Sequence, residues 1–443
     1  MNRPTKLQAA GVSAALSLLF MVVYGGSSWI TAHRGEVGTW HYSWERFIPF
    51  VPIMIVPYMS IDLFFVAGPF LCSDRSELRL LAKRISFAIL AAGVCFLLIP
   101  LRLAQDRPST SGWAGAIFDF LHSFDQPSNL FPSLHIALRT ILGHLYSRHT
   151  KGVVRAVSHL WFSLIGFSTL LTYQHHIVDV AGGFALAGLC FYLFPSRAGR
   201  SPVVPNYRIG AYYGIGTLFA FGVAWMAWPW SGILLWPGAA LALTTAGYWG
   251  VGPSIYRKMD RRLPLVTRLL FAPVIVGQRL SLRFYRRECA AWNVITPNLW
   301  IGALLNQTEG AEARRHGVSA VLDLTAEFSE TPELRSVVYR NIPVLDLTAP
   351  TLEQLNEALA FIAEHTAHGL VLIHCKIGYS RSAAVAGAYL LATGRAATVC
   401  EAIAQIRRAR PTIRIRPEIH DVLERFHGSP HARPRGRKTP VAV

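Results

Sequence analysis

Acidic residues are scarce in this chain of 443 residues, which has 25 Asp and Glu against 43 Lys and Arg and a formal net charge of +18. Cysteine is also sparse, with six residues, and no Cys/His spacing of the metal-binding kind is present. We therefore expect no metal and no other cofactor. There is no internal repeat, which argues against a solenoid or other repeat architecture. The first apolar run has no small-residue cleavage site and further runs follow it, so we expect a retained helix rather than a signal peptide.

Long apolar runs fill the first 255 residues or so, whereas the rest of the chain has the composition of a soluble protein. A helix needs about 20 apolar residues to cross a bilayer. Eight segments approach this length: 9–30, 48–72, 85–101, 132–147, 156–173, 177–195, 209–229 and 232–252. The fourth is short and contains Arg139. The sequence thus predicts a multi-pass α-helical membrane domain of about eight spans over residues 1–255.

The positive charge is unevenly distributed between the loops on the two sides of these spans. With the N-terminus inside, the loops on the opposite side hold only Arg34, Arg46, Arg102 and Arg107. The cytoplasmic segments hold Arg3, Lys6, Arg75, Arg79, Lys83, Arg84, Arg148, Lys151, Arg155, Arg197, Arg200, Arg208, Arg257, Lys258, Arg261 and Arg262. This bias predicts a multi-pass protein of a bacterial-type inner membrane with both termini in the cytoplasm. The charge then reflects topology and contact with anionic lipid, and we expect no nucleic-acid partner.

The remaining chain divides into three parts. Residues 256–290 form a basic juxtamembrane linker. The segment is either an interfacial helix or a linker without such a helix, and the sequence leaves both alternatives open. Residues 291–427 alternate between strand and helix patterns, with strands expected at 318–324, 336–342 and 370–373 and a helix opened by the capping box Thr351–Gln354. This alternation predicts an α/β domain. The last part, residues 428–443, is expected to be a basic disordered tail.

The most informative motif is the segment from His374 to Ser382, which follows the apolar strand and precedes an alanine-rich helix. A cysteine there faces the amides of a short loop and of a helix N-terminus. Such amides bind phosphate, and the same field lowers the pKa of a thiol. A thiolate in this position can attack phosphorus.

The pattern Val-x-x-His-Cys-x5-Arg-Ser-Ala resembles the signature of the cysteine-dependent dual-specificity phosphatases, and the resemblance covers about residues 292–427. It implies that Cys375 is the nucleophile, that Arg381 binds the phosphoryl oxygens and that Ser382 stabilises the leaving thiolate. It also implies that Asp346 is the general acid; Asp323 is the rival, but it lies inside a strand. The resemblance further implies a phosphate-binding loop made of His374, Lys376, Ile377, Gly378, Tyr379, Ser380 and Ser382.

Three polar clusters interrupt the membrane domain: Arg107-Pro108, residues 131–135 and residues 168–179. Polar groups inside spans are costly and mark functional sites. Counting spans places all three clusters on the non-cytoplasmic face, where they could form one site.

These clusters resemble the type 2 phosphatidic acid phosphatase superfamily, including its lipid phosphotransferases, over about residues 45–195. The resemblance implies His175 as the nucleophile, with His176 as the alternative, Asp179 as its partner and His135 as the general acid. The phosphate-binding residues it implies are Ser133 and Arg107, and Arg102 is the candidate replacement for a lysine that the usual motif has where this chain has Pro100. Ser168-Thr169 replaces the usual Ser-Arg, as in the inositol-phospholipid and sphingolipid head-group transferases, so transfer is an alternative to hydrolysis.

Together these patterns predict a membrane-bound phosphatase with two phosphoester sites, an outward histidine site and a cytoplasmic cysteine site. Membrane lipids are the expected partners and lipid phosphates the expected substrates, phosphoinositides or phosphatidylglycerophosphate among them; a phosphoprotein substrate stays open. The alternative is a lipid-sensing membrane anchor for a phosphotyrosine or phosphothreonine protein phosphatase. A transporter or flippase explains the spans but not the spacing of His175 and Asp179.

Overall fold

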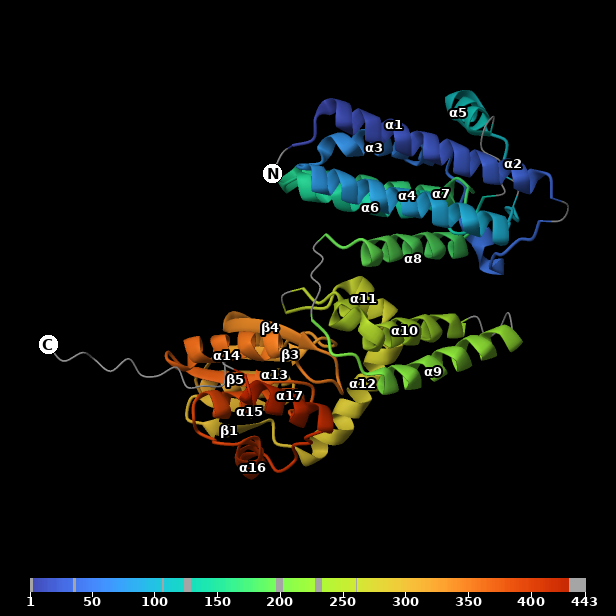
Figure 1. Ribbon diagram of the computed structural model, residues 1–443. Helices are drawn as coiled ribbons and strands as arrows, with labels where there is room; N and C mark the ends of the chain where they lie inside the picture. Colours follow the sequence, from blue (N-terminus) through green and yellow to red (C-terminus); the bar gives the residue numbers. More distant parts are fainter. Residues whose placement is uncertain are drawn as a thin grey trace. The chain divides into compact units, whose positions relative to one another are not determined.

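The computed structural model describes residues 3–34, 37–105, 107–122, 129–196, 202–227, 233–259 and 261–429, so the expected basic tail lies almost wholly outside the described residues. The chain forms two compact units, Met1–Arg197 and Ala198–Val443 (Figure 1). This division differs from the expected boundary near residue 255. The last two apolar segments therefore belong to the same unit as the α/β domain.

The first unit is a helical bundle (Figure 1). Its helices are α1 (Lys6–Phe20), α2 (Gly26–Ala32), α3 (Ile55–Leu71), α4 (Arg75–Leu98), α5 (Gly112–His122), α6 (Leu134–His149), α7 (Gly152–Leu171) and α8 (Ile177–Leu193). Helix α6 packs against α3, α4, α7 and α8, so it is surrounded by other helices. This explains how Arg139 is accommodated within an apolar segment, because its Nε donates to the carbonyl of Phe162 at 2.8 Å.

Within the described residues, five helices are long and apolar enough to cross a membrane: Lys6–Ala32, Pro52–Leu71, Arg75–Leu98, Gly152–Leu171 and Tyr207–Met226. Shorter apolar helices cover Gly112–Leu121 and Ile177–Leu193. These apolar helices indicate association with a membrane. The expected segments are all largely helical, but five rather than eight meet the requirements for a span. Helix α5 lies in a stretch where no helix was expected.

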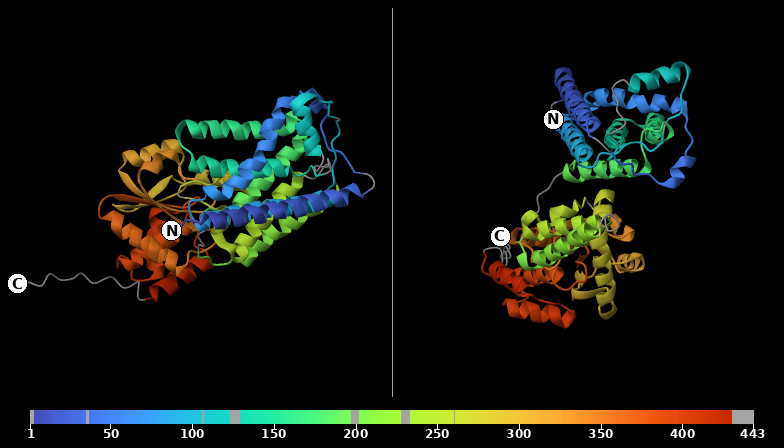
Figure 2. Two further views of the ribbon diagram at one scale, coloured as in Figure 1. Left: turned by 90° about the horizontal axis from the view of Figure 1, so that it is seen from above. Right: turned by 90° about the vertical axis from the view of Figure 1, so that its right-hand side faces the viewer.

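The second unit begins with α9 (Tyr207–Met226) and α10 (Leu235–Ala246), which lie side by side (Figures 1 and 2). Gly214 is close to Thr245 and Gly238 is close to Phe221, so the two helices run antiparallel. Turns at Gly247–Val251 and Gly252–Tyr256 lead to α11 (Leu265–Leu270) and α12 (Ala272–Tyr285). The expected linker is therefore largely helical.

Shorter helical turns occur in both units. They lie at Met21–Gly25, Ser43–Phe47, Pro52–Met54, Arg286–Glu288 and Pro332–Ser336.

A five-stranded sheet forms the centre of the rest of this unit. Its strands are β1 (Trp292–Thr296), β2 (Leu299–Gly302), β3 (Val318–Thr325), β4 (Val338–Val344) and β5 (Leu370–His374), in the order β1-β2-β5-β3-β4. The β1–β2 pair is antiparallel, and the pairs β2–β5, β5–β3 and β3–β4 are parallel. The helices are α13 (Gln307–Arg315), α14 (Leu352–Thr366), α15 (Arg381–Ala392), α16 (Val399–Ala409) and α17 (Pro417–His427). The predicted α/β domain is confirmed.

Successive side chains of β5 pack on opposite faces of the sheet. Val371 and Ile373 belong to the core formed with α14, α15, α16 and α17. Leu370 and Leu372 belong to a smaller core with α13. Such two-sided burial is typical of a central parallel strand and explains why its sequence is a continuous apolar run.

Candidate active sites

The carboxyl ends of three neighbouring parallel strands bring the reactive residues of the second unit together. Cys375 follows β5, Glu327 follows β3 by two residues, and Asp346 follows β4 by two residues. Because these strands are parallel and adjacent, their ends meet at one edge of the sheet. Helix α15 then begins at Arg381, so the loop between Cys375 and Arg381 closes over that edge.

The thiol of Cys375 is buried and lies among hydrogen-bond donors. Its Sγ accepts from the amide of Gly378 at 3.2 Å and lies 3.4 Å from Oγ of Ser382. Burial alone would raise the pKa of Cys375, but the charge of Arg381 and the hydrogen bonds from Ser382 and Gly378 outweigh burial and lower it. The sulfur is therefore held toward its nucleophilic, ionised form.

The loop keeps its shape through Gly378 and Arg410. Gly378 has φ +80°, and a Cβ there would lie 2.6 Å from the carbonyl oxygen of Gly302, so no other residue fits without a shift. The guanidinium of Arg410, buried behind the loop, donates to the carbonyls of Ile377 at 2.7 Å and Gly378 at 3.1 Å. Bonds that hold these carbonyls outward leave the loop amides free to face an anion. The sequence did not indicate this function of Arg410, although the residue lies in the segment that resembles the family.

Arg381 is held in place by Glu327, a residue that no sequence motif indicated. Its guanidinium makes a two-pronged contact with Glu327, with Nη2–Oε1 at 2.8 Å and Nη1–Oε2 at 3.2 Å, and it also donates to the carbonyl of Val344 at 2.8 Å. Both side chains are at most 2% exposed. A planar fork bound in this way has one fixed orientation. The position of Glu327 just beyond a parallel strand was the only available signal.

Asp346 lies in the same pocket and forms two ion pairs. Its Oδ2 is 3.1 Å from Nζ of Lys376 and its Oδ1 is 3.2 Å from Nη2 of Arg381. Burial raises the pKa of Asp346, but the charges of Arg381 and Lys376 outweigh burial and lower it. The ammonium of Lys376 also donates to Oε1 of Gln278, on α12, at 2.6 Å. Lys376 thus links the acid loop to α12.

The side chain of His374 points into a buried network behind the pocket instead of lining the cavity. Its Nε2 lies 2.8 Å from Glu330 and 3.8 Å from Asp323. Burial would lower the pKa of His374, but the two carboxylates raise it to about 9. Asp323 also pairs with Lys258 at 2.5 Å. Lys258, one of the cations that the charge pattern placed in the cytoplasm, therefore has a buried side chain in an ion pair.

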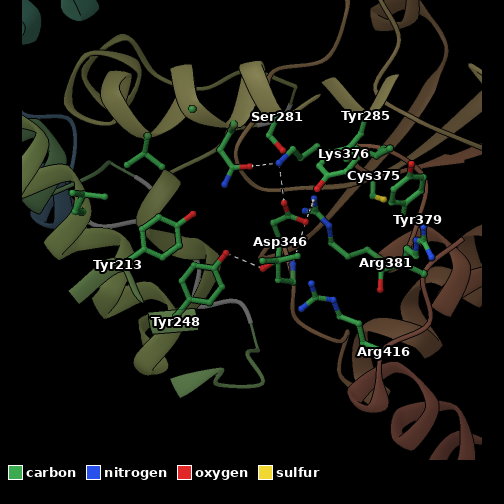
Figure 3. Close-up of a pocket in the computed structure, with 18 of the residues that line it drawn as sticks. Tyr213, Tyr248, Ser281, Tyr285, Asp346, Cys375, Lys376, Tyr379, Arg381 and Arg416 are labelled. Carbon is green, nitrogen blue, oxygen red and sulfur yellow. Dashed lines mark hydrogen bonds and ion pairs between the residues drawn. The ribbon is translucent and has the colours of Figure 1, made fainter. Parts of the chain in front are cut away.

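A cavity of about 810 Å³ opens over these residues (Figure 3). Its floor contains Cys375, Lys376 and Arg381, with Asp346 beside them. Ser281 and Tyr285, on α12, line the cavity beside Lys376 and Cys375, whereas Tyr213 and Tyr248 line the side away from Cys375; Arg416 also lines the cavity (Figure 3). The thiol at the base of the cavity is therefore open to a bound phosphate.

The first unit brings two of its predicted catalytic residues to another cavity. His135 and His175 line the same space of about 330 Å³, although they lie forty positions apart in sequence. The ring of His135 stacks on Tyr58 with ring centroids 4.2 Å apart, and its Nε2 is buried with no partner among the described residues. An unpaired buried nitrogen of this kind is unusual and fits a group that a ligand would satisfy.

The two adjacent histidines have different surroundings. Nδ1 of His175 is 3.6 Å from Oδ2 of Asp179, an i,i+4 pair at the start of α8, too long for a hydrogen bond. His176 instead pairs with Glu45 at 2.8 Å and accepts from the amide of Ala104 at 3.1 Å. Both ring nitrogens of His176 are thus engaged, which favours His175 over His176 as a nucleophile. Glu45 was not expected at this site.

The three predicted phosphate-binding residues of this unit, Ser133, Arg107 and Arg102, have different surroundings. Ser133 caps α6 by accepting from the amide of Ile136 at 3.2 Å. Gly183 lets α8 approach this cap, because a Cβ there would lie 2.4 Å from the carbonyl of Ser133. Arg107 lies over the ring of Phe118 at 4.3 Å, and its Nη1 is buried and unpaired among the described residues. Arg102 is exposed.

Comparisons with known proteins match two separate parts of the chain to two families. The sequence pattern of the dual specificity phosphatase catalytic domain matches residues 299–427, and that of the PAP2 superfamily matches residues 50–193. The chain is therefore a fusion of a PAP2 superfamily domain with a dual-specificity phosphatase catalytic domain. It is a phosphoric monoester hydrolase of the dual-specificity type.

Individual relatives resemble the second unit. Human phosphatidylglycerophosphatase and protein-tyrosine phosphatase 1 is 29% identical over 174 residues, 37% of this chain and 86% of the human protein. Arabidopsis thaliana phosphatidylglycerophosphate phosphatase PTPMT2 is 26% identical over 166 residues, 36% of this chain and 72% of the plant protein. The crystal structure of PTPMT1 in complex with PI(5)P is similar at 26% identity, covering 31% of this chain and 95% of that structure with a TM-score of 0.29.

Proposed function

We propose that this chain is a membrane enzyme with two phosphoester sites, both of which act on lipid phosphates or lipid head groups. The observation that carries the proposal is the buried Cys375 thiol, its pKa lowered beside Arg381, in a chain whose other half is a bundle of apolar helices. Relatives of the second unit are named for phosphatidylglycerophosphate, which supports a lipid phosphomonoester as substrate.

At the cysteine site, the thiolate of Cys375 attacks phosphorus, the bond from phosphorus to the leaving oxygen breaks, and Asp346 gives that oxygen a proton. Water then attacks the phosphocysteine. It passes a proton back to Asp346, and the phosphorus–sulfur bond breaks to release inorganic phosphate and the thiolate. Arg381 and the loop amides bind the phosphoryl oxygens throughout, and Ser382 donates to the departing sulfur.

In the empty pocket the two ion pairs of Asp346 outweigh its burial and lower its pKa, which favours the carboxylate over the acid. A phosphate dianion that binds Arg381 takes the guanidinium edge that Asp346 now contacts at 3.2 Å. The anion also places negative charge beside the carboxylate. Both changes raise the pKa of Asp346, so substrate binding itself supplies the acid in its protonated form.

At the histidine site, His175 is the proposed nucleophile, Asp179 orients and charges its ring, and His135 protonates the leaving group. The unpaired nitrogens of His135 and Arg107 support a bound phosphate there. Water as the acceptor gives hydrolysis, and a lipid alcohol gives head-group transfer. Arg102 and Ser133 have the weaker support, because one is exposed and the other caps a helix.

The proposed topology places both termini in the cytoplasm, with the cysteine site inside and the histidine site on the other face of the membrane. The distribution of lysine and arginine between alternate loops supports it. A reducing compartment would keep the Cys375 thiol active.

The test uses the full chain purified in detergent and assayed for phosphate release from phosphatidylglycerophosphate, phosphatidate and phosphoinositides. We expect Cys375→Ser to abolish one activity and His175→Ala another. Cys400→Ser and His159→Ala, which change an exposed cysteine and an exposed histidine, are the matched controls. Brisk turnover of phosphopeptides without any lipid turnover would favour the alternative, a protein phosphatase on a lipid-sensing anchor. That alternative is supported by the second half of the human relative's name.

A further inference from the structure

The hairpin formed by α9 and α10 has no function in either phosphatase resemblance, yet it lies in the same compact unit as Cys375. The apolar runs at 209–229 and 232–252 predict these helices to be the last two spans of the membrane domain. The family match to the catalytic domain begins only at residue 299, well after the hairpin ends. The hairpin is therefore an addition to the catalytic domain.

The hairpin makes two hydrogen bonds to the loop that carries Asp346. Oη of Tyr248, just after α10, donates to the backbone carbonyl of Asp346 at 2.8 Å. Nδ2 of Asn206, just before α9, donates to the carbonyl of Leu347 at 3.0 Å. Leu347 has φ +62°, a left-handed conformation that a leucine rarely adopts. The surrounding contacts must hold the loop in this conformation, and the two bonds from the hairpin are among them.

The hairpin also supplies an apolar wall to the catalytic cavity. Tyr213, Pro237 and Leu241 line the cavity from the two helices. Figure 3 shows Tyr248 in contact with Asp346, with Tyr213 beside it and Arg381 farther away on the other side of Asp346. A ligand bound here would have its phosphate on the charged floor and its organic part against this wall. Apolar lining with a few convergent polar groups is the usual form of a small-molecule site.

We propose that the α9–α10 hairpin completes the cysteine site: Tyr248 positions the Asp346 loop, and the wall around Leu241 binds the hydrocarbon part of a lipid phosphomonoester. This inference rests on the proposed roles of Cys375 and Asp346. Tyr248 is a positioning residue, since it contacts the backbone of Asp346 and acts through it. Because α9 is also apolar enough to cross a membrane, a lipid could reach the cavity while its acyl chains stay in the bilayer.

The first test compares two leaving groups in the full chain with Tyr248→Phe. An alkyl oxygen needs a proton from Asp346, whereas the nitrophenolate of p-nitrophenyl phosphate leaves almost unaided. We expect kcat/KM for dioctanoyl phosphatidylglycerophosphate to fall about tenfold, the effect of one net hydrogen bond, with little change for p-nitrophenyl phosphate. Tyr207→Phe, at an exposed tyrosine on α9, is the control. An equal loss on both substrates, or no loss on either, overturns the positioning role.

The second test replaces Leu241 with alanine. We expect KM for dioctanoyl phosphatidylglycerophosphate to rise several-fold, up to about tenfold, and to rise by a larger factor than KM for p-nitrophenyl phosphate, which has no acyl chains. Leu218→Ala, on the exposed side of α9, is the matched control. Equal effects of Leu241→Ala and Leu218→Ala overturn the apolar wall.

The outcome also separates this inference from the proposed function. A wild-type chain that cleaves phosphothreonine peptides and no lipid overturns both the lipid substrate and the lipid wall. The Tyr248→Phe comparison, run with phosphothreonine peptide against p-nitrophenyl phosphate, would then still decide the positioning role. A wild-type chain that hydrolyses none of these esters overturns both proposals.

Discussion

The protonated state of His374 makes the second unit lose stability as the pH rises. In the unfolded chain a histidine has a pKa near 6.5, and in the folded chain Asp323 and Glu330 raise the pKa of His374 to about 9. A group whose pKa is raised by folding contributes stability that is fully present below the unfolded pKa and is lost as the pH rises through the folded pKa. The window for this loss is therefore pH 6.5 to about 9.

The size of the effect follows from the shift. One pKa unit corresponds to about 1.4 kcal/mol, so a rise from 6.5 to about 9 is worth on the order of 3 kcal/mol. For a unit of this length, such a change lowers the melting temperature by roughly 6–12 °C. The interaction is weakly screened by solvent, because the side chains of His374 and Glu330 are at most 1% exposed.

The assay is a urea series on the full chain in detergent, with a short proteolytic pulse at each urea concentration. The surviving fraction of the C-terminal unit gives its free energy of unfolding. We expect His374→Gln to remove most of the decline between pH 6.5 and 9, and His316→Gln, at an exposed histidine, to keep it. If His374→Gln prevents folding, Glu330→Gln should shift the decline to lower pH. A flat wild-type profile, or an undiminished slope in His374→Gln, would refute the reasoning.

Three further predictions concern the phosphate-binding loop. Gly378→Ala should lower kcat/KM for p-nitrophenyl phosphate by about a hundredfold or more, because the new Cβ forces the loop away from Gly302; wild-type kinetics would contradict this strain. Arg410→Lys keeps the charge but loses the forked contact with two loop carbonyls. We expect about a tenfold loss of kcat/KM that added guanidinium partly restores. An unaffected enzyme would show that the contact of Arg410 with the loop is dispensable. Ser382→Ala removes a hydrogen bond that lowers the pKa of Cys375, so the acid limb of the pH–rate profile should move to higher pH. Because Ser382 also donates to the departing sulfur, breakdown of the phosphocysteine should slow and a burst of p-nitrophenol should appear. An acid limb that does not move would count against the hydrogen bond to sulfur.

Short-range patterns explain what the sequence could predict. The strand before Cys375, the helix after Arg381 and the capping box at Thr351 all depend on neighbours a few positions away, and the structure has each of them. The approach of His135 to His175 was predicted by counting spans, and both residues line one cavity.

The missed residues are those whose partners lie far away in the sequence. Glu327 binds Arg381 across 54 positions, and Gln278 binds Lys376 across 98. Apart from the position of Glu327 just beyond a strand, no local pattern distinguishes either residue, because glutamate and glutamine are common on surfaces. The packing of the hairpin could not be predicted for a related reason: apolar periodicity predicts a helix but does not identify the domain against which it packs.

The ion pair between Asp346 and Arg381 also affects how the catalytic cycle ends. Inorganic phosphate leaving the pocket uncovers a guanidinium edge, and the carboxylate is near enough to bind it again. Reforming that pair offsets part of the free energy lost when the anion departs. The empty enzyme is thereby stabilised against its product complex, which lowers product affinity and keeps the thiol available for another substrate.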